Sequence, residues 1–295
     1  MRNPYKTRTG GAAVTVFMPY DCGSRCPFCA DEGEYAGLTG FSEAAIQRSI
    51  RKMHEITPAC DFVFAGGEPL ANLAALQGML DAIPAGHRIY INTALPVSQD
   101  RSAAEILEFT RRNRDKITCM NVSRNLRPCA AESGDDLLVR LGVPVCVDCV
   151  LYRDSPAQEL PAYLERFEKI PGIRVQFRFD CASTTPENLY EEEEDPILCD
   201  LKKIARYTGL RGSRIRCEFC FDYQGMKLTY CRALPNSTVT ERDPHTGAIY
   251  DILYTVLIKK NGEIHSDWNG TRLDLAAYRG AAHEPYGLRW LGRAD

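Results

Sequence analysis

The sequence lacks any long apolar run. No stretch reaches the roughly 20 consecutive apolar residues that a membrane-spanning helix needs. The N-terminal segment MRNPYKTRTGG is positively charged but has no apolar region behind it, so it does not have the form of a secretory signal. These absences exclude a membrane-spanning helix and predict an unexported, soluble protein of the cytoplasm.

An excess of charge of either sign is also missing. Lysine and arginine total 36 against 39 aspartates and glutamates, which gives a formal net charge of −3 at pH 7. Such a balance provides no global attraction to nucleic acid or to a membrane surface. No strongly basic stretch with interleaved aromatic residues is present either. The composition therefore gives no strong nucleic-acid signal and predicts no membrane partner.

Cysteine, in contrast, is abundant, with 13 residues in a chain of 295. A small secreted scaffold would use such cysteines for disulfides. The odd number, the length of the chain and the missing signal segment favour a reducing compartment instead. Metal ligation and several buried thiols are the better account of these cysteines.

The first 210 or so residues repeat one pattern, in which a short β-branched or aromatic run precedes a segment with helical period. Strands are expected over 12–18, 61–65, 88–93, 117–123, 144–150 and 173–179. Helices are expected after the N-cap Ser42, over 70–83, 102–113 and 134–141, around 160–167, and after the N-cap Asp195. These alternations predict right-handed βαβ units around a parallel sheet, either doubly wound or curved into a barrel.

Three of the cysteines lie in one short loop after the first expected strand. The loop has the sequence CGSRCPFC, with the cysteines at Cys22, Cys26 and Cys29. Thiolates at this C-x3-C-x2-C spacing converge on one soft metal centre without help from distant segments. Structural zinc sites and electron-transfer clusters normally use four protein ligands, so three cysteines predict a metal with one position open.

Other unusual features also follow expected strands directly. The sequence GGEP at 66–69 follows the second strand, Asn92-Thr93 ends the third, and Ser123-Arg124 ends the fourth. In parallel α/β folds the loops at the carboxyl ends of the strands converge to form the site. We therefore expect these segments and the cysteine loop to lie around one site.

The cysteine loop, with the aromatic Phe28 before its last cysteine, and the GGEP stretch after the next strand together resemble the radical S-adenosylmethionine superfamily. The resemblance covers residues 12 to about 210. It implies an enzyme with a partial (β/α)6 TIM-like barrel. It further implies a [4Fe-4S] cluster on Cys22, Cys26 and Cys29, with S-adenosylmethionine chelating the fourth iron. One electron, from a reductant such as flavodoxin or ferredoxin, would cleave the cofactor to methionine and a 5'-deoxyadenosyl radical that abstracts hydrogen from a substrate.

The same resemblance implies roles for the residues of the second strand end. Gly66 and Gly67 let the backbone approach the cofactor closely, since neither carries a Cβ. Glu68 offers a carboxylate to the methionine amino group, and Pro69 stiffens the turn. Phe28 is expected to lie along the adenine ring.

Polar residues at the later strand ends have more than one interpretation. Ser123 and Arg124 hold the ribose and the methionine carboxylate, or they are an ordinary strand-end cap and a surface arginine. Asn92 and Thr93 have the same two interpretations. Arg178, at the end of the sixth strand, faces adenine, substrate or solvent.

The chain changes character after residue 212, which predicts a barrel domain over 1–212 and a C-terminal β-rich extension over 213–295. The extension contains a second metal-like spacing, formed by Cys217, Cys220 and Cys231. An auxiliary iron-sulfur cluster, a zinc knuckle completed by His245 or His265, and unrelated thiols are the three readings of this spacing.

The extension also predicts a hairpin. Its strands are expected over 249–259 and 264–268, with Asn261-Gly262 supplying the turn. Such a hairpin could cover the open side of a partial barrel.

Three hypotheses describe the purpose of the chain. A small-molecule or nucleotide-like substrate is the main one, because the first expected strand begins near residue 12 and leaves no room before it for a peptide-recognition domain. A peptide-modifying enzyme, of the kind that matures ribosomal natural products, is the alternative. A metal-bound redox or structural module without enzymatic activity belongs to another class and rests on the cysteine count alone.

Overall fold

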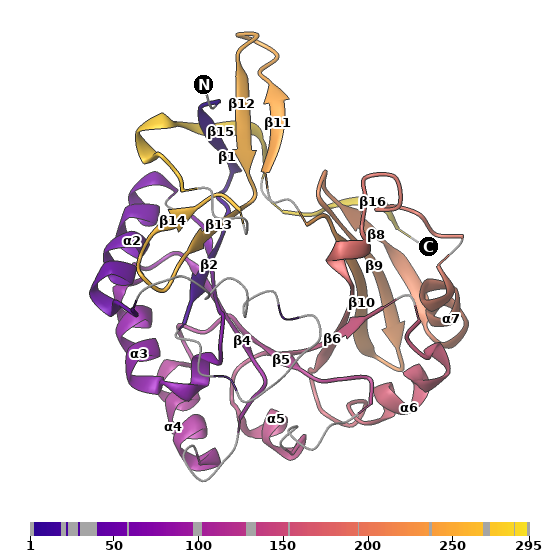
Figure 1. The fold of residues 1–295 in the computed structure, drawn as a ribbon. Coiled ribbons are helices and arrows are strands. Elements are labelled where there is room, and N and C mark those ends of the chain that lie inside the picture. Colours follow the sequence, from indigo (N-terminus) through magenta and orange to yellow (C-terminus); the bar gives the residue numbers. More distant parts are fainter. Residues whose placement is uncertain are drawn as a thin grey trace. The chain divides into compact units, whose positions relative to one another are not determined.

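The computed structural model forms two compact units, each assembled from separate segments of the chain (Figure 1). It describes residues 3–18, 22, 29, 40–57, 59–96, 102–127, 134–152, 154–193, 195–235, 238–267, 272–285 and 287–293. Unit 1 comprises Met1–Asn92, Asp115–Thr118 and Asn236–Tyr286, and unit 2 comprises Thr93–Arg114, Cys119–Pro235 and Gly287–Asp295. The domain boundary that the sequence predicts at residue 212 does not coincide with the boundaries of these units, and it stays a prediction.

The main sheet of unit 1 consists of parallel strands with one antiparallel edge. Its neighbours along the sheet pair as β13 with β2, β2 with β3, and β3 with β4, while β14 is antiparallel to β13. The strands are β2 (Ala13–Phe17), β3 (Asp61–Ala65), β4 (Arg88–Thr93), β13 (Thr255–Ile258) and β14 (Ile264–His265). The buried residues of β2 and β3 include Val14, Val16, Phe62 and Phe64, so both strands contribute to the core.

A smaller sheet of unit 1 joins the first strand of the chain to the C-terminal part. Its order is β11-β12-β1-β15. The strands are β1 (Tyr5–Thr9), β11 (Thr238–Arg242), β12 (Ile249–Leu253) and β15 (Tyr278–Pro285). The buried Arg8 of β1 binds Glu241 of β11 and donates from Nε to the Tyr254 hydroxyl at 2.9 Å. Sequence periodicity did not predict β1, because it is short and four of its five residues are charged or polar.

The helices of unit 1 lie side by side against one side of its strands in Figure 1. The helix α2 (Glu43–Ile56) begins where predicted, since the Ser42 side chain accepts from the Ala45 amide. The helix expected over 70–83 is instead two helices, η1 (Pro69–Ala71) and α3 (Leu73–Ala82). The break falls at Asn72, whose side chain caps α3 by accepting from the Ala75 amide at 3.0 Å. A further short helix, η4 (Leu275–Ala277), precedes β15.

Unit 2 continues the strand and helix alternation and then changes to antiparallel pairing. Strands β5, β6, β7 and β10 are parallel neighbours, and β10, β9, β8 and β16 follow as antiparallel neighbours. The strands are β5 (Cys119–Ser123), β6 (Val145–Leu151), β7 (Arg174–Phe179), β8 (Arg206–Gly212), β9 (Arg216–Tyr223), β10 (Met226–Ala233) and β16 (Arg289–Arg293). The antiparallel strands β8 to β10 cross the boundary expected at residue 212.

The helices of unit 2 are α4 (Ala103–Asn113), η2 (Ala157–Glu159), α5 (Asp136–Arg140), α6 (Leu160–Glu165), η3 (Cys181–Ser183) and α7 (Pro196–Ile204). Ser102 and Glu105 form a capping box at α4. The predicted cap Asp195 accepts from the amides of Ile197 and Leu198. Figure 1 shows α6 and α7 along one side of the strands of this unit.

The predicted C-terminal hairpin is present, but its first strand is divided. Residues expected as one strand form β12 in the small sheet and β13 beside β2, with Tyr254 between them. The turn forms at the predicted dipeptide, where Gly262 has φ of 83° and donates its amide to the Lys259 carbonyl. A Cβ on Gly262 would come within 2.5 Å of the Ala45 side chain, so the turn requires glycine.

Within the described part of the chain, no helix has both the length and the apolar character needed to cross a membrane.

A pair of histidines joins the last turn of α2, which contains His54, to His87 just before β4. His54 Nδ1 and His87 Nε2 are 2.8 Å apart, and the Cys60 amide donates to His87 Nδ1 at 3.1 Å. The His87 ring also contacts Phe62 edge-on. Burial lowers the pKa of His87, since the charged imidazolium loses its hydration there.

The histidine pair predicts acid-sensitive folding of unit 1. The pKa of His87 is lower in the folded protein than its unfolded value of about 6.5, so protonation favours the unfolded state. The contribution of His87 to the free energy of unfolding is therefore complete above that pH and is lost as the pH falls. Urea unfolding at pH 7 and pH 5 should therefore show a smaller loss of stability in His87→Gln than in the unchanged protein. His245→Gln, at an exposed histidine of the same unit, is the control and should behave like the unchanged protein. An unchanged pH dependence in His87→Gln would contradict this reading.

Candidate functional site

The cysteine loop and the GGEP turn begin at two neighbouring strand ends. Phe17 of β2 pairs with Ala65 of β3, and the next amide, that of Met18, donates to the Ala65 carbonyl at 2.8 Å. One strand therefore ends at Phe17, five residues before Cys22, and the other ends directly before Gly66. The parallel pairing brings the starting points of both motifs together, as the sequence predicted.

Two of the loop cysteines, Cys22 and Cys29, have partly exposed thiols that form no disulfide. Cys26 and Phe28 lie outside the described residues. The chemistry of the donor set fits a soft metal, because the described thiols are reduced and accessible.

The GGEP turn has a backbone that only glycine adopts readily. Gly66 and Gly67 have φ of 71° and 54°, in the left-handed region where a Cβ is unfavourable. Two successive residues of this kind turn the chain sharply out of β3. Glu68 then lies 4% exposed, and its Oε1 accepts from the Leu70 amide at 2.9 Å to begin η1. The buried Pro69 occupies the first turn of that helix.

Asn92 and Thr93 end β4 with side chains in different settings. Asn92 is half-buried in unit 1. Thr93, in unit 2, is 3% exposed, and its hydroxyl accepts from the Leu95 amide at 2.8 Å. That bond holds Leu95 at φ of 57°, a strained value for a residue with a branched side chain. Thr93 therefore shapes the loop that follows β4.

Arg124 is a buried structural cation rather than a surface arginine. It is 1% exposed, so the surface position assumed in one reading is wrong. Its Nε donates to Asp135 Oδ1 at 3.1 Å, and its Nη1 donates to the carbonyls of Ala94 and Ser123. These bonds tie the end of β5 to the loop after β4 within unit 2. The neighbouring Ser123 is exposed.

Arg178 lies on β7, where it pairs with Asp148 of β6. The distance from Arg178 Nη2 to Asp148 Oδ2 is 2.8 Å, and the Arg178 side chain remains 40% exposed. Burial raises the pKa of Asp148 against the attraction of this arginine. Arg178 is thus held by a carboxylate at its guanidinium group, and its side chain remains partly accessible.

The three cysteines of the extension do not face one point. Cys217 and Cys220 are three residues apart on β9, so their side chains point to opposite faces of the sheet. Cys217 donates to the Leu189 carbonyl at 2.8 Å, while Cys231, opposite Glu218, shares the face of Cys220. Burial raises the pKa of Cys217 to about 12. Among the described residues, no three His, Cys, Asp or Glu side chains are grouped as metal ligands.

Sequence reasoning missed a row of charged residues on one face of unit 2. Arg211 and Arg216 both bind Glu218, which is 5% exposed at its side chain. The signal was present in the alternation of charged and apolar residues over 174–179 and 216–221. The cysteines in the segment 216–221 suggested a metal site, so this alternation was not used to predict a charged face.

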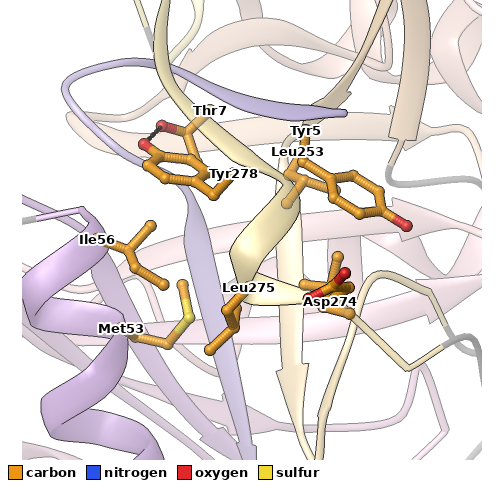
Figure 2. Close-up of a pocket in the computed structure, with 9 residues that line it drawn as sticks. Tyr5, Thr7, Met53, Ile56, Leu253, Asp274, Leu275 and Tyr278 are labelled. Atoms are coloured by element: carbon orange, nitrogen blue, oxygen red, sulfur yellow. Dashed lines mark hydrogen bonds between the residues drawn. The ribbon is translucent and has the colours of Figure 1, made fainter. Parts of the chain in front are cut away.

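Two pockets lie away from the motifs. The one in Figure 2 is in unit 1, lined by residues such as Met53, Ile56 and Leu275 beside the hydrogen-bonded pair Thr7 and Tyr278. Its volume of about 10 Å³ leaves room for at most one water molecule. The second, of about 300 Å³, lies in unit 2 beside Phe179, Asp195 and Arg232. The described residues of the two motifs line neither of them.

Comparisons with solved structures reveal the fold. Two structures of SuiB from Streptococcus suis align with the chain. The one bound to S-adenosylmethionine covers 90% of this chain at a TM-score of 0.52 and 13% identity. The one bound to the precursor peptide SuiA covers 87% at a TM-score of 0.51 and 12% identity. The chain has the fold of SuiB.

This likeness confirms the fold class predicted from the sequence, a partial (β/α)6 TIM-like barrel with a C-terminal β-rich extension. At 12% and 13% identity this likeness shows the fold alone. The chain spans 59% and 63% of the length of the two SuiB chains. A third structure, anSMEcpe with bound AdoMet and a Cp18Cys peptide, covers 62% of this chain and 53% of its own at a TM-score of 0.45 and 15% identity. No protein-family model matches the sequence, and a search of curated proteins finds no match.

The buried bonds of Arg124 predict a large effect on stability. Arg124→Met removes the three hydrogen bonds that the guanidinium donates, one of them to Asp135. This loss should lower the free energy of unfolding by about 2 to 3 kcal/mol. Arg127→Gln is the control, since that arginine is 74% exposed and pairs with Glu159 at the surface. It should change stability by no more than about 0.5 kcal/mol. Equal effects of the two substitutions in urea unfolding would contradict the structural role of Arg124.

Proposed function

We propose that this chain is a radical S-adenosylmethionine enzyme that acts on a peptide. What supports the proposal is the hydrogen bond from Met18 to Ala65, which joins the ends of two adjacent strands; in the sequence the cysteine loop follows one of these strands and GGEP follows the other. Neither motif alone is specific, but the two at neighbouring ends supply a cluster and a cofactor contact at one place.

Cys22, Cys26 and Cys29 would hold the [4Fe-4S] cluster, and their number leaves one iron for S-adenosylmethionine. When bound, the cluster would pass one electron to S-adenosylmethionine, releasing methionine and a 5'-deoxyadenosyl radical that abstracts hydrogen from the substrate. An external reductant such as flavodoxin or ferredoxin would have to supply that electron.

Glu68 would bind the amino group of S-adenosylmethionine. Its carboxylate is buried, where a charge-assisted hydrogen bond to an ammonium group is stronger than in water. The left-handed Gly66 and Gly67 present their backbone groups without Cβ atoms, so a ligand can approach them closely. Pro69 and the start of η1 would hold the carboxylate in place. Asn92, Thr93, Ser123 and Phe28 stay candidates for contacts with the rest of the cofactor.

A peptide is the better supported substrate class. SuiB, whose fold this chain shares, is seen with a precursor peptide, and no comparable observation supports the small-molecule or nucleotide-like substrate. The peptide alternative therefore takes precedence over the main hypothesis from sequence. The non-enzymatic redox or structural module gives no account of a GGEP turn beside the cysteine loop.

Cleavage of S-adenosylmethionine tests the enzyme proposal. The anaerobically reconstituted protein with dithionite should form 5'-deoxyadenosine, and Cys26→Ala should abolish it. Glu68→Gln should raise the Kd for S-adenosylmethionine about tenfold, the loss expected for one buried charge-assisted hydrogen bond. Glu55→Gln is the control, because Glu55 is an exposed partner of Lys52 in the same unit. Unaltered cofactor affinity in Glu68→Gln would favour the non-enzymatic module.

Iron content tests the number of clusters. Because Cys217 faces away from Cys220 and Cys231, reconstituted protein should hold about four irons, the content of one [4Fe-4S] cluster. Cys217→Ser should retain the same iron content, and Cys22→Ser should lose it. Seven or eight irons that fall to four in Cys217→Ser would establish the auxiliary cluster instead, and zinc in place of iron would contradict the radical mechanism.

A further inference from the structure

One face of the strands of unit 2 is charged although the opposite face is apolar. Successive side chains of a strand alternate between the two faces. On one face, Tyr163 of α6 packs against Phe177 of β7, and Asp195 at the start of α7 accepts from the Tyr230 hydroxyl at 2.6 Å. The helices therefore cover the face that carries Phe177 and Tyr230.

The other face is rich in charged residues, among them Arg174 and Arg178 on β7, Arg211 on β8 and Arg216 on β9. We call these four residues, with Asp148 and Glu218 between them, the arginine face. The strand register aligns part of it in one row, because Arg178 lies opposite Cys231, Cys231 opposite Glu218, and Glu218 opposite Arg211. Three strand spacings of about 4.8 Å separate Arg178 from Arg211 along this row, or about 14 Å.

The carboxylates of the arginine face hold the arginines in place without neutralising them. Glu218 binds Arg211 and Arg216, and the two arginines lower its pKa against the effect of burial. Asp148 binds Arg178. Four guanidinium groups against two carboxylates leave an excess of two positive charges within the arginine face, in a protein whose net charge is −3. Arg206, Lys227 and Asp222, on the same side of the sheet, add one more positive charge.

The arginines remain accessible while their carboxylate partners are buried. The side chains of Arg178, Arg211 and Arg216 are 40%, 37% and 36% exposed, against 12% for Asp148 and 5% for Glu218. A guanidinium has five donors, so one bound to a buried carboxylate keeps donors for a ligand. The ion pairs also fix the side-chain rotamers, which lowers the entropy lost on binding. Such an arrangement is a preorganised site for carboxylates.

We propose that the arginine face binds an acidic segment of the peptide substrate. The inference rests on the proposed peptide-modifying function and names the chemistry that the peptide carries. Two carboxylates about four residues apart in an extended chain span the distance from Arg178 to Arg211. A nucleic acid is the poorer fit, because affinity for its backbone depends on neutralising several phosphates and this face offers an excess of two charges.

Fluorescence anisotropy with labelled twelve-residue peptides tests the proposal on the full chain. One probe carries glutamates at positions 4, 5, 8 and 9 among glycines and serines, and two others carry glutamine or lysine at the same positions. The glutamate peptide should bind, and its Kd should rise with NaCl. The glutamine and lysine peptides should bind at least about tenfold more weakly.

Single substitutions assign the binding to the face. Arg178→Gln and Arg211→Gln should each raise the Kd of the glutamate peptide about tenfold, as expected for one lost charge-assisted contact. Arg111→Gln is the matched control, since Arg111 pairs with Glu108 on α4 and is 71% exposed. Its Kd should equal that of the unchanged protein. Circular dichroism of each variant identifies any that fail to fold, and the three-peptide comparison on the unchanged protein decides the question without them.

Three outcomes would overturn the proposal. These are equal affinity for the glutamate and lysine peptides, equal effects of Arg211→Gln and Arg111→Gln, and tighter binding of a twelve-nucleotide oligothymidylate that Arg211→Gln weakens. The proposed function is separately tested by 5'-deoxyadenosine formation without peptide. Selective binding of the glutamate peptide without cofactor cleavage would support the binding role of the arginine face and contradict the proposed enzyme. Cleavage without selective binding would support the enzyme and contradict the binding role.

Discussion

Parallel strand pairing is the constraint on which the rest of the structure depends. In a parallel pair the carboxyl ends of both strands lie at the same edge of the sheet. The bond from Met18 to Ala65 is the last one between β2 and β3, and it places the departures of the cysteine loop and the GGEP turn beside each other. The left-handed Gly66 and Gly67 then turn the chain away and leave Glu68 buried at the start of η1.

The same pairing accounts for the charged face of unit 2. Helices cover one side of β7 and β10, so the residues there are mostly apolar or aromatic, as Phe177 and Tyr230 are. The exception, the buried Arg232, pairs with Asp195. The alternate positions of β7 point away from the helices, so they can carry charged side chains such as Arg174 and Arg178. Buried carboxylates such as Glu218 stabilise the cations there, and this combination of fixed and accessible charge is suited to an anionic ligand.

The sequence predicted the regular part of the fold well because strong local signals agreed with it. Short β-branched runs predicted the six strands β2 to β7, and caps such as Ser42 and Asp195 predicted helix starts. Predictions failed where tertiary contacts decide the outcome. Asn72 divides an otherwise continuous helix, and the strand expected over 249–259 changes sheets at Tyr254.

The site was predictable only in its motifs. C-x3-C-x2-C and GGEP have fixed spacings that carry their chemistry, whereas the burial of Arg124 depends on Asp135 and on the Ala94 carbonyl, which no local pattern reveals. The opposite error is a local pattern that predicts a site which the fold does not form, as at Cys217, Cys220 and Cys231. Their spacing suggests a metal site, but strand geometry sends Cys217 to the face opposite Cys220.

The central claim is that the chain directs radical chemistry at a peptide. Deuterium transfer into 5'-deoxyadenosine tests it most directly, using two perdeuterated mixtures with the reconstituted protein. One is a tryptic digest of bacterial protein, and the other is a metabolite extract freed of peptides. The account predicts deuterium in 5'-deoxyadenosine with the digest and none above background with the extract. Transfer from the extract alone would contradict it.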